Sequence, residues 1–164
     1  MRKVPIALLS AALLACGEQP TTPSDSPAFD RLDDADQGGM RFTTTMTGAE
    51  EAPGPGDPDG TGTFTMTVNP GLGLICYEIE VQNITLPAAA SHIHIAPAGS
   101  PGPVRVPLMA PGADGKSAAC TAVGDAAAFT DALLLDLRKN PASYYVNVHT
   151  SDFPAGAVRG QLGD

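Results

Sequence analysis

Three histidines are the residues of this chain whose type and spacing could bind a transition metal. His92 and His94 are separated by one residue, and His149 lies far along the chain in the stretch 144–162. In a β-strand, residues i and i+2 point to the same face, about 7 Å apart at their Cα atoms, so His92 and His94 can bind one ion together. A histidine from a neighbouring strand would complete a three-nitrogen set, which suits copper or zinc. The hypothesis is a site for a single copper or zinc ion.

The neighbours of these histidines place all three outside the hydrophobic core. His92 and His94 alternate with isoleucines, and His149 alternates with valines. If the apolar residues face inwards, the imidazoles face outwards on compatible surfaces. The competing interpretation is that they are solvated or hydrogen-bonded strand histidines, because His-x-His alone is a weak pattern. A simple distance separates the two: ring nitrogens more than about 8 Å apart cannot share an ion with bonds near 2 Å.

The elements that must position these histidines are short strands between Pro- and Gly-rich turns. Alternation of apolar and polar residues is clearest over 61–69 and 74–82, which predict a hairpin. The full set of expected strands is 41–47, 61–69, 74–82, 91–96, 104–109, 117–121, 143–150 and 157–162. This pattern predicts an all-β antiparallel Greek-key sandwich or barrel of about 7–8 strands with one short helix.

The one helical pattern follows Thr130, a suitable N-cap. Asp131 favours the first turn, three leucines form an apolar stripe, and Pro141 ends the helix.

The N-terminal segment reads as an export signal. Residues 1–15 contain a basic start and an apolar run too short to span a bilayer, and are expected to be a signal peptide. The residues around Cys16 resemble the lipobox of bacterial lipoproteins, in which the cysteine is lipidated. An ordinary secretory signal is the alternative, and both remove the protein from the cytoplasm.

Three regions therefore make up the predicted domain organisation. Residues 1–15 are the signal peptide, 16–39 the lipidated cysteine with a disordered tether rich in Pro, Ser, Thr and Asp, and 40–164 the β-domain. The expected location is the cell membrane or outer membrane, with the domain facing the periplasm or exterior. The membrane is the expected partner, reached through the N-terminal lipid.

The charge of the chain excludes one large class of partners. Its formal net charge is −9, and removal of the first fifteen residues, which hold two basic and no acidic side chains, makes it −11. Such a surface repels phosphate backbones, so nucleic-acid binding is not expected. The sequence identifies no protein or ligand partner and no oligomeric state.

Two cysteines remain if Cys16 carries lipid. An even pair in an oxidising compartment predicts a disulfide between Cys76 and Cys120. It would close a loop of about 44 residues and contribute roughly 2–4 kcal/mol. Two buried free thiols are the alternative.

Several stretches resemble the CHRD domain, a module named after chordin and found in many bacterial secreted proteins. They are GAEEAP (48–53), ASHIHIA (90–96) followed by GPV (102–104), and YVNVHTSDFPAGAVRGQL (145–162). The family motif falls on Glu51, Asn147, Phe153, Gly156, Arg159, Gly160 and Gln161. The resemblance covers the chain from about residue 40 onwards. It implies an extracellular β-domain with no generally established catalytic activity.

A fainter resemblance is to copper/zinc superoxide dismutases, which have a Greek-key barrel with a His-x-His strand. A later strand of those enzymes carries another copper-binding histidine, and an arginine follows. His92, His94, His149 and Arg159 fall in that order here. The chain has only three histidines, which excludes a bridged two-metal site and leaves a mononuclear one. For Arg159 we favour a structural role at a strand end, paired with an acidic residue such as Glu51.

Two functions follow from these patterns. The first is an exported, membrane-anchored CHRD-domain lipoprotein with a non-enzymatic binding or structural role at the cell envelope. No catalytic residues are predicted, because Ser151 and Asp152 lie too close to His149 in sequence to form a triad with it. The alternative is a mononuclear copper- or zinc-binding protein that uses three histidines on a superoxide-dismutase-like barrel.

Overall fold

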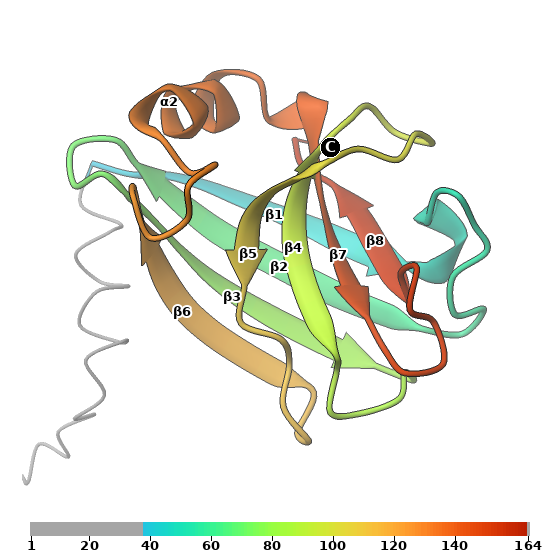
Figure 1. The fold of residues 1–164 in the computed structure, drawn as a ribbon. Helices are drawn as coiled ribbons and strands as arrows, with labels where there is room; N and C mark the ends of the chain where they lie inside the picture. The colour runs from blue at the N-terminus through green and yellow to red at the C-terminus, as the bar shows by residue number, and fades with distance from the viewer. Residues whose placement is uncertain (1–37, 164) are drawn as a thin grey trace, which may run out of the picture.

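Eight antiparallel strands form one curved sheet in the computed structural model, which describes residues 38–163 (Figure 1). Across the sheet, the strands lie in the order β5 (Val104–Leu108), β4 (Ala90–Ile95), β7 (Tyr144–His149), β8 (Val158–Gln161), β1 (Met40–Thr47), β2 (Thr61–Asn69), β3 (Leu74–Gln82) and β6 (Lys116–Ala122). The predicted all-β antiparallel fold is confirmed, with each expected strand within two residues of its observed bounds. The signal peptide, Cys16 and nearly all of the tether lie outside the described residues.

Alternation explains why these segments are strands. In β2, Phe64, Met66 and Val68 are fully buried, and threonines occupy most of the positions between them. Phe64 pairs with Ile79 of β3 in the predicted hairpin, so two apolar rows meet on the inner face. Non-consecutive strands become neighbours because the chain crosses the sheet three times, from β3 to β4, from β5 to β6 and from β6 to β7.

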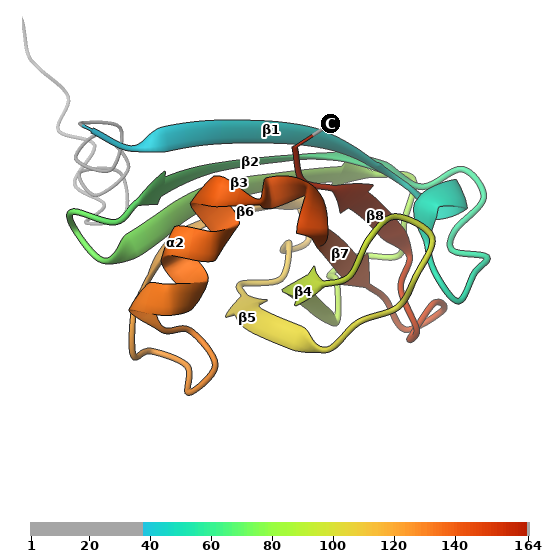
Figure 2. The same cartoon turned by 90° about the horizontal axis from the view of Figure 1, so that it is seen from above.

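The sheet curls around its own core. Figure 2 shows β4 and β5 facing the part of the sheet formed by β1, β2 and β3. The fully buried side chains between them include Met46, Phe64, Ile75, Ile79, Ile93, Val106, Val146 and Val148. The backbone at Met109 helps to bridge the two edges: its N–H donates to the Tyr77 hydroxyl at 2.7 Å, and its carbonyl accepts from Ser91 of β4 and Ser117 of β6.

One α-helix, α2 (Asp131–Lys139), packs at an end of the curled sheet (Figures 1 and 2). The Thr130 side chain accepts a hydrogen bond from the N–H of Leu133, which confirms the predicted N-cap. Leu133, Leu134 and Leu137 are buried. Short 3-10 turns, η1 (Gly48–Glu50) and η2 (Pro141–Ser143), follow β1 and precede β7. Within residues 38–163, no helix has both the length and the apolarity needed to cross a bilayer.

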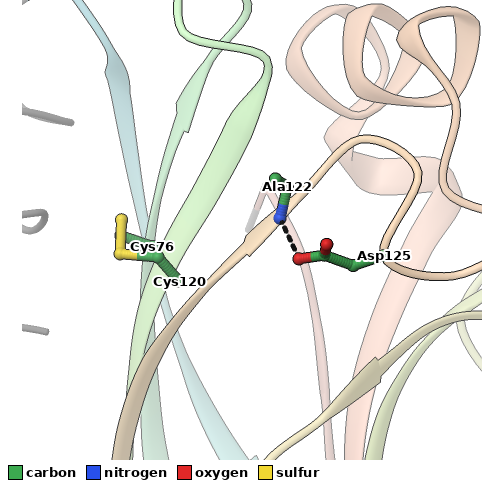
Figure 3. The surroundings of a disulfide bond; sticks show 4 residues. All are labelled: Cys76, Cys120, Ala122 and Asp125. Carbon is green, nitrogen blue, oxygen red and sulfur yellow. Dashed lines mark hydrogen bonds between the residues drawn. A yellow bond between two sulfur atoms is a disulfide. The ribbon is translucent and has the colours of Figure 1, made fainter.

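The predicted disulfide is present between Cys76 of β3 and Cys120 of β6 (Figure 3). The two cysteines are direct cross-strand partners with a Cα–Cα distance of 4.0 Å. Just beyond them, the Asp125 carboxylate accepts from the N–H of Ala122 and caps the end of β6. The bridge therefore ties β6, an edge strand, to its neighbour β3.

Candidate metal centre

The three histidines come together on the outer face of β4 and β7. One ligand atom from each of His92, His94 and His149 lies within 4.8 Å of the other two. The closest pair is His92 Nδ1 and His149 Nε2, at 3.3 Å. The strand register produces this cluster, since Ala90 pairs with His149 and His92 pairs with Asn147. The nitrogens are therefore well inside the 8 Å limit that the sequence hypothesis requires.

Hydrogen bonds fix which ring nitrogens carry protons. His94 Nδ1 lies 2.9 Å from the carbonyl oxygen of Gly102, and His149 Nδ1 lies 3.1 Å from that of Pro154. A carbonyl can only accept, so Nδ1 is the N–H donor in both rings and Nε2 carries a lone pair. His94 Nε2 is buried and has no hydrogen-bond partner. Backbone carbonyls that orient imidazoles in this way are the usual outer support of histidine ligands.

The surroundings keep the three rings neutral. Burial, with smaller contributions from the neighbouring His149 and His94, lowers the pKa of His92 to about 4. Burial is also the main cause that lowers the pKa of His94 and of His149. Neutral imidazole is the form that binds a metal, so at pH 7 the cluster does not have to lose protons first.

The donor set fits a copper or zinc ion. Three Nε2- or Nδ1-type bonds of 2.0–2.1 Å place the nitrogens about 3.4 Å from one another. The closest pair of nitrogens, at 3.3 Å, already has this spacing, and the widest separation in the cluster is 4.8 Å. A small rotation of one ring closes the remaining gap. Three neutral nitrogen ligands are typical of copper and zinc, whereas calcium and magnesium prefer oxygen.

On one side of the histidine cluster, His94, Tyr145 and Arg159 form a stack. The His94 ring lies parallel to the Tyr145 ring, with centroids 4.7 Å apart and an 8° angle between the planes. The Arg159 guanidinium packs against the Tyr145 ring, with Cζ 3.5 Å from the ring centroid. This cation–π contact and the ring stacking together fix the orientation of His94.

Arg159 is itself buried, with 1% of its surface exposed. Its guanidinium donates to the carbonyl oxygens of Ser100 and Pro97 at 2.9 and 3.0 Å, and to the side-chain oxygen of Gln161 at 3.2 Å. These bonds differ from the direct pairing with Glu51 expected from the sequence. Glu51 acts on Arg159 through electrostatic attraction, which favours the charged guanidinium and opposes the effect of burial on its pKa.

Glu51, in the loop that follows η1, lies close to Arg159 and Asn147. It is 8% exposed, and burial raises its pKa to about 7, although the charge of Arg159 and a hydrogen bond from Asn147 act in the opposite direction. Gly156 leaves room for this carboxylate: a Cβ there would lie 2.4 Å from Glu51 Oε1, and its φ is +142°. Asn147, 2% exposed, lies between Glu51 and the histidines, with Oδ1 3.1 Å from His149 Nε2.

The other motif residues shape the β7–β8 turn and its contacts. The Phe153 carbonyl accepts from the N–H groups of Thr150 and Gly156. Gly160 allows close approach to β1, because a Cβ there would lie 2.3 Å from the Thr45 carbonyl oxygen. Gln161 donates to the carbonyls of Ala96 and Ala142.

Sequence reasoning missed two kinds of contributors. The sequence pattern gave Tyr145 no role, although its position opposite His94 follows once β4 and β7 are paired. The backbone carbonyls of Gly102 and Pro154, which accept from His94 and His149, could not be predicted from the sequence, because every residue has a carbonyl.

Comparison with known proteins agrees with the motif. The family model of the CHRD domain matches residues 42–162, and the chain therefore belongs to the CHRD-domain family. No curated protein and no solved structure matched the chain.

Proposed function

We propose that this CHRD-domain protein binds a single copper or zinc ion through His92, His94 and His149. The observation that carries the proposal is the convergence of three neutral imidazoles, two with Nε2 left unprotonated by their Nδ1–H bonds. The buried lone pair of His94 Nε2, which has no partner, favours a ligand over a purely structural arrangement.

The role we propose is binding, without catalysis. In a superoxide-dismutase-like reaction, an accessible arginine beside the metal would attract the anionic substrate. Arg159 is 1% exposed, and carbonyl and amide oxygens already accept from its guanidinium. This supports holding or carrying an ion over turnover of an anion.

We further propose that the protein acts at the cell envelope, exported and anchored through a lipid on Cys16. The basic start, the apolar run and the cysteine after Ala15 support this. The disulfide agrees with an oxidising compartment. Mass spectrometry of the mature protein would contradict the anchor if it found an unmodified Cys16 or cleavage elsewhere.

The metal content of the purified mature protein tests the binding proposal. After loading with copper or zinc and removal of excess ion, we expect close to one ion per chain. His92→Ala and His149→Ala should each lose it, whereas Glu80→Gln, on the exposed face of β3, should retain it. No metal above background in the unmodified protein would overturn the proposal and leave a structural role for the domain.

A further inference from the structure

Asn147 occupies a position next to the histidines that its ordinary hydrogen bonding does not explain. Its Oδ1 faces His149 Nε2 at 3.1 Å. Since His149 Nδ1 donates to the Pro154 carbonyl, Nε2 is an acceptor, and so is an amide oxygen. Two acceptors at hydrogen-bond distance repel each other unless a positive centre lies near both. Asn147 also lies close enough to interact with the His94 ring.

Glu51 sets the direction in which the Asn147 amide points. A carboxylate accepts hydrogen bonds, so the bond between the two side chains uses the amide Nδ2 of Asn147 as donor. With Nδ2 directed at Glu51, Oδ1 must point the other way, towards the imidazoles. Gly156 keeps the space that Glu51 needs for this contact, and Glu51 Oε1 is buried with no hydrogen-bond partner.

We propose that Asn147 Oδ1 is the fourth donor of the metal site, and that Glu51 is a positioning residue that presents it and offsets the charge of a divalent ion. This inference rests on the proposed three-histidine function. The complete donor set is then three nitrogens and one oxygen. An amide oxygen is a hard ligand, so it favours Cu(II) or Zn(II) and adds little for the soft ion Cu(I).

The proposed arrangement has one rival for the same side chains. If the amide were turned round, Nδ2 would donate to His149 Nε2 and Oδ1 would face a protonated Glu51. Asn147 would then be part of the support of His149 and would not touch the ion. The two arrangements differ in whether a side chain without an N–H can replace Asn147.

Affinities of the full mature protein for Cu(II), Zn(II) and Cu(I), measured by competition with chelators, test the inference. Glu51→Gln should weaken Cu(II) and Zn(II) binding by about 10–100-fold, the usual range for the outer support of a metal site, and Asn147→Ala, which removes a donor atom itself, should weaken it by at least as much. Cu(I) affinity should change by less than about threefold, since copper(I) gains little from oxygen. Each tenfold selective loss of Cu(II) raises the one-electron potential by about 59 mV. A merely structural role would lower both affinities together.

A charge-swapped double variant provides the rescue. In Glu51→Gln/Asn147→Asp, the glutamine amide can donate to the new carboxylate, whose other oxygen faces the ion. Divalent affinity should return to within about threefold of the unmodified protein, and the Cu(II) electron paramagnetic resonance spectrum should regain the features that Asn147→Ala loses. No rescue, or equal losses of Cu(I) and Cu(II) affinity, would overturn the inference.

The outcomes separate the two proposals. If Asn147→Ala leaves Cu(II) affinity unchanged while His149→Ala abolishes it, the three-histidine site stands without a fourth donor and this inference fails. If the unmodified protein binds none of the three ions, both proposals fail.

Discussion

The sheet has two halves, β1–β2–β3–β6 and β5–β4–β7–β8, whose outer faces are both polar but differ in how far they are buried. On β2 and β3, the outward side chains include Thr65, Glu78 and Glu80, which lie at or near the surface, and Glu80 pairs with Lys116 of β6 in water-exposed surroundings, at 2.5 Å. On β4, β7 and β8, the outward side chains include the histidines, Asn147, Arg159 and Gln161, most of which are buried beneath loops. Alternation in the sequence indicates that both faces are polar. Only the face of β4, β7 and β8 is covered by loops, and the candidate metal site lies there.

The difference appears in the electrostatics of each half. Lys116 has its pKa raised chiefly by its hydrogen bond to Glu80, an effect of a local partner at the surface. For Glu51 and His92 the first cause is burial, which disfavours the charged form of each group. A buried polar layer has to satisfy its own hydrogen bonds, so single changes there should cost far more than matched changes on the exposed half.

The largest expected difference comes from removing one cation from each half. Arg159→Met leaves the carbonyls of Pro97 and Ser100 without their donors, and should destabilise the protein by about 3–5 kcal/mol, as for other broken buried networks. Lys116→Met breaks only an exposed ion pair and should not change the denaturation midpoint measurably. Urea unfolding of both variants provides the measurement. Equal losses would contradict the contrast between the halves.

A smaller difference is expected between two glycines with positive φ. Gly156→Ala places a methyl group against the Glu51 carboxylate and forces strained backbone, at a cost of about 2–4 kcal/mol. Gly124→Ala meets nothing within 4 Å and has only its φ of +95° to accommodate, so about 1 kcal/mol is expected. Thermal unfolding compares the two. If the costs are the same, Glu51 does not fill the space that Gly156 leaves.

The smallest effect is a gain in stability from Glu51→Gln in the metal-free protein. Because the folded-state pKa of Glu51 is raised from 4.5 to about 7, its contribution to stability is present at low pH and is lost as the pH rises through that range. At pH 8 the neutral glutamine should therefore stabilise the fold by roughly 2 kcal/mol, and near pH 4.5 the gain should disappear.

The histidines change the stability of the fold with pH in the direction opposite to Glu51. The pKa of His92 is lowered from 6.5 to about 4, so its contribution to stability is present above pH 6.5 and is lost as the pH falls through that window. This loss should occur in both proteins, so the difference between their urea midpoints isolates Glu51. A constant difference from pH 4.5 to 8 would contradict the raised pKa.

Much of the fold was predictable because its information is local. Alternation located β2 and β3 to the residue, and the cap and leucine stripe located α2. The site was only half predictable. His92 and His94 share a face by period alone, but their meeting with His149 depends on β4 pairing with β7, and the paired residues lie 49 to 59 positions apart in the sequence. The position of Glu51 beside Asn147 depends on how η1 and the loop after it pack against β8. No periodic pattern in the sequence predicts that packing.

The segment between β4 and β5 has the composition that proteases usually favour, with prolines and glycines on the surface. Here its carbonyls at Pro97, Ser100 and Gly102 bond to Arg159 and His94, and the N–H of Gly102 donates to the Tyr145 hydroxyl. Peptide cleavage requires the chain to leave those partners and fit an extended groove. The loop that looks easiest to cut is therefore protected by the same side chains that surround the histidine cluster, and its resistance to proteases depends on them.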